Sequence, residues 1–294
     1  MSYICIVNDI DMKRITIFII ICTLLSACVI RESNATEKTI FVTITPLKRI
    51  VEEITCGDFH VEVLVPEGAS PETFEPTARQ LTSLNNASKV YAIGLIDFEQ
   101  SLIANLDESR IVDLSEGIET MEGSCSHRHK HHSHGIDPHT WTSPRALKTM
   151  ARTIERSIMA EYPDSTKYSE AADRLVERIE ALDSHCQESV ERSNTQAILI
   201  YHPAYTYYTR DYGIRQIAIE HDGKEPSPRQ LKAIIEEALT NNIRTILLQP
   251  QYSIDKVATI AKECQAEVVV TNPLAEDILL EIQRVTDIMC RSNE

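Results

Sequence analysis

A long stretch with helical periodicity near the middle of the chain places the strongest limit on the fold. Between Asp164 and Asn194, apolar residues recur at spacings of three, four and seven, at Tyr168, Leu175, Ile179, Leu182, Cys186 and Val190. This spacing puts them on one face of a helix of about eight turns. A helix of that length is unusual inside a compact domain, so we expect it to join two lobes as a rigid rod. A coiled coil is the alternative, although the stretch is short for one.

Short apolar segments alternate with helical patterns on both sides of this stretch. Before it, we expect strands at 39–44, 61–65, 90–93 and 111–114 and helices at 47–55, 77–87, 98–106 and 144–160. After it, we expect strands at 197–201, 216–219, 245–248 and 268–270 and helices at 204–212, 228–240, 254–264 and 277–290. This order predicts an α/β fold of two lobes, each with a mainly parallel sheet flanked by helices. Ligands of such sheets bind beyond the carboxyl ends of the strands.

The first residues resemble a targeting signal. Two basic residues precede an apolar run at 15–25, which is too short to span a bilayer and is typical of a signal-peptide core. The run ends in Leu25-Ser26-Ala27-Cys28, which resembles a bacterial lipobox and implies cleavage before Cys28 and acylation of that cysteine. An N-terminal anchor that is never cut is the alternative. Because acidic residues are unusual in such a leader, we expect translation to start at Met12 rather than Met1.

The sequence therefore predicts four parts. They are a signal peptide at 1–27, an N-terminal lobe at 28–164 that includes a polar loop at 123–137, a linking helix at 165–194 and a C-terminal lobe at 195–294.

The net charge and the cysteines limit the partners and the cross-links. The 44 acidic and 29 basic residues give a net charge of -15 at pH 7, which repels phosphate backbones and argues against binding to nucleic acid. Outside the cytoplasm a disulfide is permitted. Cys264 and Cys290 lie near the ends of the last two expected helices and are the first pair to consider. Free buried thiols are the equal alternative.

Five of the ten histidines lie in one short polar segment, at His127, His129, His131, His132 and His134. Imidazoles at this density bind zinc, copper and nickel. The segment has no periodicity and offers no fixed geometry, so we expect an accessory site with weak, labile binding. A solvated low-complexity stretch is the alternative.

Other candidate ligands are isolated. His202 directly follows an expected strand, at the end where α/β proteins bind their ligands. His139 lies in the segment Asp137-Pro138-His139-Thr140-Trp141, just before a helix, where a capping or packing role would be the default. Glu72 and Glu75 lie in a proline-rich loop after another strand and are candidate oxygen ligands, unless they face solvent.

Seven segments occur in an order that is known from one protein family. They are GASPETFEPT at 68–77, the histidine-rich segment, IDPHTW at 136–141, YHPAYTYYTRDYGI at 201–214, GKEPSP at 223–228, LLQPQYS at 247–253 and TNPL at 271–274. Together they resemble the zinc and manganese solute-binding proteins of bacterial ABC transporters, the ZnuA/TroA-like group. The resemblance covers nearly the whole chain after the leader. It implies two α/β lobes joined by one long helix, with a metal ion held in the cleft between them.

The resemblance also implies the ligands. His139 and His202 match two ligand histidines of the family, and Glu72 lies where many relatives have a histidine. Asn272 lies where relatives usually have an aspartate at or near the metal, and Gln249 where some have a glutamate. The expected metal ligands are therefore Glu72, His139 and His202, with Asn272 and Gln249 as further candidates.

Two histidines and one glutamate suit zinc with a water molecule in the fourth position. They also suit manganese or iron, because oxygen donors favour harder ions. The histidine-rich segment is typical of the zinc branch, so zinc is the expected ion. Because imidazoles must be neutral to bind it, affinity should fall below about pH 6.5.

The function implied by the resemblance is capture of the ion and its delivery to an ABC permease, without catalysis. The protein would be a monomer, held by its lipid at the extracytoplasmic side of a bacterial membrane. A manganese or iron carrier of the same family is one alternative. A secreted zinc-dependent hydrolase with Glu75 as the base is another, although no HExxH motif is present. A third is a cell-adhesion protein with a structural metal.

Overall fold

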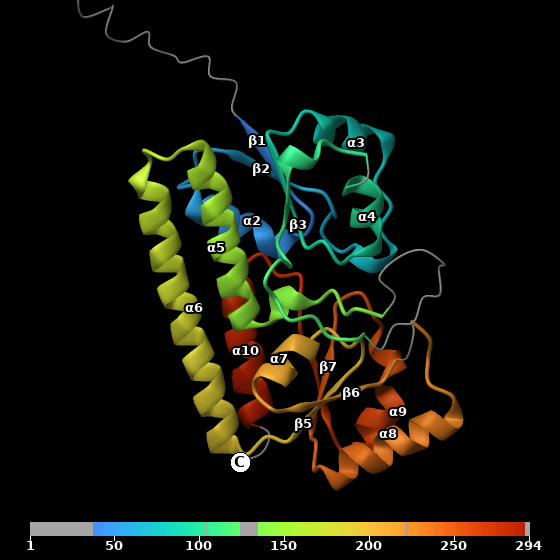
Figure 1. Ribbon diagram of the computed structural model, residues 1–294. Helices are drawn as coiled ribbons and strands as arrows, with labels where there is room; N and C mark the ends of the chain where they lie inside the picture. The colour runs from blue at the N-terminus through green and yellow to red at the C-terminus, as the bar shows by residue number, and fades with distance from the viewer. Residues whose placement is uncertain (1–37, 104, 124–134, 221–222, 292–294) are drawn as a thin grey trace, which may run out of the picture. The chain divides into compact units, whose positions relative to one another are not determined.

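The computed structural model describes residues 38–103, 105–123, 135–220 and 223–291, which belong to one compact unit (Figure 1). The expected lipidation site, Cys28, and the five clustered histidines lie outside these residues, so the signal peptide and the accessory metal loop stay predictions. Within the described part of the chain, no helix is long and apolar enough to cross a membrane.

The first sheet consists of four parallel strands in the order β2-β1-β3-β4. The strands are β1 (Thr39–Val42), β2 (His60–Val63), β3 (Lys89–Ala92) and β4 (Ile111–Asp113). The helices between them are α2 (Thr45–Ile54), α3 (Ala78–Asn85) and α4 (Asp97–Ile103). At the turn after β3, Gly94 has a φ of +80°, and any side chain there would collide with the carboxylate of Asp113. The turn therefore requires glycine.

The second sheet repeats this arrangement in the order β6-β5-β7-β8, again with all strands parallel. Its strands are β5 (Ala197–Ile200), β6 (Arg215–Ala218), β7 (Thr245–Leu248) and β8 (Glu267–Val270). Its helices are α7 (Thr206–Asp211), α8 (Pro228–Thr240), α9 (Ala258–Cys264) and α10 (Ile278–Arg291). The predicted α/β fold with two parallel sheets is confirmed. In each sheet the first strand has neighbours on both sides, which places the switch in strand order at the carboxyl ends of β1 and β5.

Two long helices, α5 (Pro144–Glu161) and α6 (Thr166–Ser193), link the sheets. The 28 residues of α6 confirm the predicted long helix. All six apolar residues that predicted it are buried. The helix is not a free rod, because it packs along α2, α5 and α10 (Figure 1). One hydrophobic core joins residues of the first sheet, α5, α6, the second sheet and α10, including Ile40, Leu147, Leu175, Ile200 and Ile282.

The disulfide that we considered between Cys264 and Cys290 is not formed. Both residues are free thiols and both are buried. Cys264 on α9 packs in a small hydrophobic cluster around the second sheet, whereas Cys290 on α10 packs in the main core that contains α6. The alternative of two free buried thiols describes the structure, because the two helices pack against different cores.

Candidate metal centre

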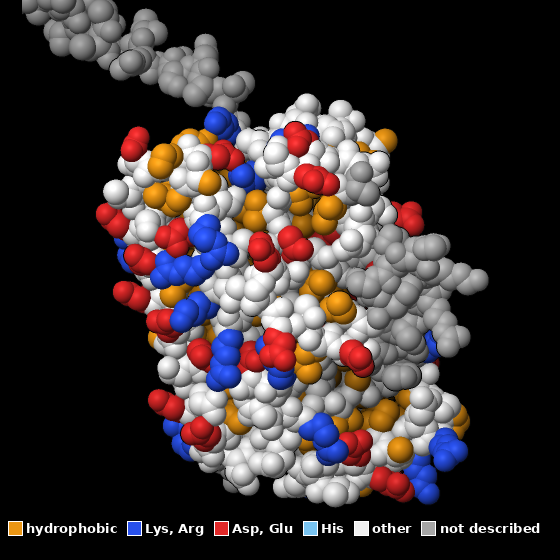
Figure 2. Space-filling view, in the orientation of Figure 1, with side chains coloured by type: hydrophobic (Ala, Val, Ile, Leu, Met, Phe, Trp, Pro, Cys, Tyr) orange, Lys and Arg blue, Asp and Glu red, His pale blue; other side chains and the backbone are white. Residues whose placement is uncertain are grey.

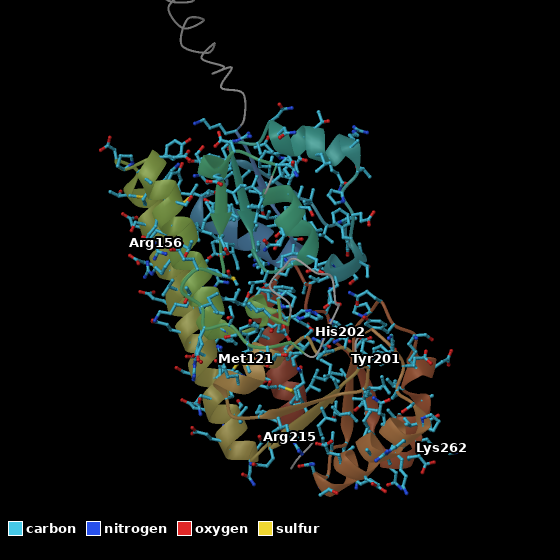
Figure 3. The ribbon with its side chains drawn as sticks, turned by 45° about the vertical axis from the view of Figure 1, so that its right-hand side comes forward. Met121, Arg156, Tyr201, His202, Arg215 and Lys262 are labelled. Carbon is cyan, nitrogen blue, oxygen red and sulfur yellow. The ribbon has the colours of Figure 1, made fainter. Side chains whose placement is uncertain are left out.

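Three side chains from three separate segments meet at the carboxyl ends of the two sheets. Glu72 lies in a 3-10 turn, Pro71–Thr73, in the loop that follows β2. His139 immediately precedes a second such turn, Thr140–Thr142. His202 follows β5, and Figure 3 shows it at the end of the second sheet that faces the first sheet. One ligand atom from each of the three lies within 4.8 Å of the others.

The distances between the donor atoms match the spacing around a single metal ion. The Nε2 atoms of His139 and His202 are 3.4 Å apart. Glu72 Oε1 lies 3.4 Å from Nε2 of His202 and 3.9 Å from Nε2 of His139. Donors about 2.1 Å from a tetrahedral zinc ion are about 3.4 Å from one another. An ion placed among these three atoms would therefore need only small movements of the side chains.

The ring of His139 is oriented by a carboxylate on its own segment. Asp137 Oδ1 lies 2.9 Å from Nδ1 of His139 and accepts a 2.8 Å hydrogen bond from the backbone N–H of the same residue. Its other oxygen accepts a 2.6 Å bond from the hydroxyl of Thr206. Burial raises the pKa of Asp137, but the charge and hydrogen bonds of His139, with the bond from Thr206, outweigh it and lower the pKa. The ring therefore presents Nε2 to the site.

The ring of His202 is oriented by a residue that the sequence did not identify. Glu220, two residues after the end of β6, lies 2.8 Å from Nδ1 of His202 and is only 3% exposed. Its one signal in the sequence was its position after a strand. β6 pairs with β5, but the strand order that makes Glu220 a neighbour of His202 is not evident from the sequence.

Without a bound cation, the negative charge of Glu72 is balanced by a proton on His202. Burial would lower the pKa of His202, but hydrogen bonds and charges from Glu220 and Glu72 raise it to about 10. For Glu72, burial raises the pKa, but the hydrogen bond and charge of His202, with the charge of His139, lower it overall. The metal-free site therefore holds an ionised Glu72 beside a protonated His202, and a divalent cation would take the place of that proton.

The space between the three side chains is small and partly apolar. The cavity has a volume of about 30 Å³ and is lined by Ser70, Pro71, Glu72, His139, Trp141, His202, Ala204, Gln249, Gln251, Tyr252, Pro273 and Leu274. The ring of Trp141 lies 5.1 Å from that of His139, and its Nε1 donates a 2.8 Å hydrogen bond to the carbonyl of Pro273. Such a cavity has room for one ion with about one water molecule.

Gln249 lines this cavity and bonds to the backbone of one of the histidines. The amide oxygen of Gln249 accepts a 3.2 Å hydrogen bond from the backbone N–H of His202, and its Nε2 donates a 2.8 Å bond to the carbonyl of the same residue. Both polar atoms of Gln249 thus bond to the backbone of His202, and its role as a ligand stays a prediction.

The role of Asn272 as a ligand also stays a prediction. Its Oδ1 accepts a 3.1 Å hydrogen bond from the backbone N–H of Leu274. Its side chain lines a neighbouring cavity that contains neither histidine. Glu75 does not line the cavity; it is exposed and lines a groove with α3 and α4 that Glu72 also borders. Of the candidates named from the sequence, the structure brings together Glu72, His139 and His202.

Comparison with known proteins identifies the family. The model of the ZnuA family, described as zinc-uptake complex component A, periplasmic, matches residues 40–281. The chain belongs to this family. The crystal structure of a ZnuA protein, 30% identical, superposes with a TM-score of 0.79 and covers 88% of this chain and 100% of its own. The Mn²⁺ complex of FpvC from Pseudomonas aeruginosa, 22% identical with a TM-score of 0.73, shares the fold.

Two bacterial proteins illustrate the range of the family. The zinc-binding lipoprotein AdcA of Streptococcus pneumoniae serotype 4 is 28% identical over 279 residues, which cover 90% of this chain and 56% of AdcA. The chain thus spans little more than half of that relative. The high-affinity zinc uptake system protein ZnuA of Bacillus subtilis is 24% identical over 259 residues, which cover 83% of this chain and 80% of the relative.

Proposed function

We propose that this protein captures a zinc ion with Glu72, His139 and His202 and passes it to a membrane transporter. The observation that supports this most is the convergence of the three donor atoms within 4.8 Å in a small cavity. Two imidazoles and one carboxylate, with a fourth position left for water, form a donor set that zinc accepts. The ion is cargo here, so the site must both bind it and release it.

The relatives support the choice of zinc. The crystal structure of a zinc-bound deletion mutant of ZnuA is 30% identical to this chain, with a TM-score of 0.78. The names of the AdcA and ZnuA relatives also specify zinc. Manganese or iron is the second candidate, because Glu72 supplies an oxygen donor and oxygen favours harder ions.

The place of action follows from the same proposal. An acylated Cys28 would hold a monomer at the extracytoplasmic side of the membrane, where the loaded protein would dock on an ABC permease. The net charge of -15 attracts cations. On the face drawn in Figure 2, acidic and basic side chains are interspersed, so this attraction is diffuse there.

Growth in zinc-poor medium tests the proposal: deletion of the gene should prevent growth, and the intact protein should restore it.

The site is better suited to binding than to catalysis. A zinc hydrolase needs a general base next to the metal-bound water. Among the described residues that line the cavity, the single carboxylate is Glu72, which we assign to the metal. Because Glu75 faces a different groove, it does not supply that base.

Glu72 should determine the preference between zinc and manganese. Glu72→His replaces the oxygen donor with a third imidazole, so we expect zinc to be favoured over manganese by about tenfold more than in the wild type, or about 1.4 kcal/mol. Competition between the two ions in isothermal titration measures this. Glu75→His is the matched control, because the same change in the same loop lies outside the cavity. Equal preferences in the wild type and Glu72→His would exclude Glu72 as a ligand.

Zinc binding should release a proton. His202 has its pKa raised to about 10 in the empty site, above the ordinary value of 6.5, so its ring is protonated at neutral pH. Zinc must displace that proton, and affinity should therefore rise about tenfold per pH unit between about pH 6.5 and 8.5. The two carboxylates move this window above the one expected from the sequence. Titration at pH 7.5 in buffers of different ionisation enthalpy should give about one proton released per zinc. A value near zero would contradict this assignment.

A further inference from the structure

The backbone at His202 is held from the neighbouring strand by a side-chain amide. Gln249 directly follows β7, which pairs with β5, and it is 1% exposed. It accepts a hydrogen bond from the N–H of His202 and donates one to its carbonyl. The amide of Gln249 thus continues the hydrogen-bond ladder of the sheet past the ends of both strands. These two hydrogen bonds hold the backbone at His202 without the participation of an ion.

The ring of His202 is held from the strand on the other side. Glu220 follows β6, and its backbone N–H donates a 3.0 Å hydrogen bond to the carbonyl of Tyr201, which extends the pairing of β5 with β6. Its carboxylate then reaches Nδ1 of His202 at 2.8 Å. Carboxylate oxygens accept hydrogen bonds, so this contact favours a proton on Nδ1. Nε2 faces Glu72 and His139 and is the nitrogen left for an ion.

Glu220 is placed to orient the histidine and not to bind the ion itself. It contacts Nδ1, whereas Glu72 and His139 lie on the side of Nε2, at 3.4 Å from it in each case. Glu220 does not belong to the group of possible ligands formed by Glu72, His139 and His202. It is also absent from the lining of the cavity.

We propose that Glu220 and Gln249 are positioning residues that orient the ring of His202 and keep its proton on Nδ1 when the ion takes the place of the proton on Nε2. This inference rests on the proposed function, since it concerns the same ion. Both residues follow strands of the second sheet, as does His202. The loops of that sheet alone therefore prepare one of the three ligands, while Glu72 comes from the loop after β2 and His139 from the segment between the sheets. Partners that hold ligand histidines in this way contribute about 10–100-fold to metal affinity.

Glu220→Gln tests the inference with almost no change of shape. The amide can donate a hydrogen bond to Nδ1 as well as accept one, so it permits the tautomer in which Nε2 carries the proton and faces the site. We expect the affinity for zinc, added as the free ion in isothermal titration, to fall about 10–100-fold. Glu236→Gln is the matched control, because Glu236 lies exposed on α8, pairs with Lys232 and does not line the cavity. The control should leave the affinity unchanged.

A second readout separates positioning from a general loss of structure. In the metal-free wild-type protein, the proton on Nδ1 of His202 should give a downfield NMR resonance because it is bonded to a carboxylate. That resonance should shift or disappear in Glu220→Gln and persist in Glu236→Gln, while thermal unfolding stays cooperative in both. If Glu220→Gln does not fold, Glu220→Asp, which keeps the charge but is one methylene shorter, is measured in the same way and should also lose affinity.

The outcomes distinguish this inference from the proposed function. Failure of the wild type to bind zinc would overturn the proposed function. Tight binding by the wild type, with equal affinity and an unchanged Nδ1 resonance in a folded Glu220 variant, would overturn the positioning role alone. Loss of affinity together with loss of the resonance would support it.

Discussion

Replacing His202 with alanine is expected to weaken zinc binding by more than about 100-fold, because the loss of a ligand should exceed the loss of a partner that only orients one. The substitution removes the nitrogen that lies 3.4 Å from both Glu72 Oε1 and His139 Nε2. It also leaves Glu220, which is 3% exposed, without the ring that it contacts. Isothermal titration of the purified protein with zinc measures the effect, with a competing chelator if the wild type binds too tightly.

The control for this change is another histidine of the same chain. His185 lies on α6 and pairs with Asp287 at 3.0 Å. It does not line the cavity. His185→Ala should leave zinc affinity unchanged. If both variants bind zinc as tightly as the wild type, the ion is held elsewhere and the ligand assignment is wrong.

Replacing Trp141 with alanine is expected to lower the free energy of unfolding of the metal-free protein by about 3–5 kcal/mol. The side chain is 1% exposed and belongs to the main hydrophobic core. It also donates a hydrogen bond to the carbonyl of Pro273, far along the chain. The change would therefore create a cavity at the point where the segment after the first sheet meets the loop after β8. Urea unfolding followed by circular dichroism measures the loss. Tryptophan fluorescence cannot be used, because the variant lacks the single tryptophan of the chain.

Two further variants separate the contributions at this position. Trp141→Phe keeps most of the packing and loses the hydrogen bond, so it should cost less, about 1–3 kcal/mol. Leu280→Ala is the surface control, since Leu280 is 61% exposed, and it should be close to neutral. A loss below about 1 kcal/mol for Trp141→Ala would mean that this residue does not hold the two segments together.

Most helices and strands were predictable because their apolar residues recur with the period of a helix or a strand. For α8 and β7, the predicted ranges 228–240 and 245–248 agree with the structure at both ends. Six of the buried apolar residues of α6 recur at helical spacing, so its length was evident from one face alone. The short turns at Pro71–Thr73 and Thr140–Thr142 were missed, because three residues are too few to show a period.

The candidate ligands were predictable in part. His202 could be placed because it directly follows a strand, and Glu72 and His139 because of the resemblance to a family. Glu220 could not be found, since its contact with His202 depends on which strands are neighbours in the sheet. Gln249 and Asn272 were further candidates because of the same resemblance. The position of a residue in the chain does not show where its amide finds hydrogen bonds.

The exact bounds of the two lobes remain a prediction. Each sheet has its own helices, as the alternating pattern predicted. The main hydrophobic core nevertheless includes residues of both sheets, together with α5, α6 and α10. A periodic pattern shows which face of an element is buried, but not which other element covers it. The contact of α10 with α6 could therefore not be predicted from the sequence.

The most direct test of the central claim is the position of zinc in crystals of the loaded protein, located by anomalous scattering at the zinc edge. We predict one fully occupied peak in the cavity, about 2.0–2.2 Å from a carboxylate oxygen of Glu72 and from Nε2 of His139 and His202. Zinc bound tightly at any other position, with this cavity free of metal, would contradict the account.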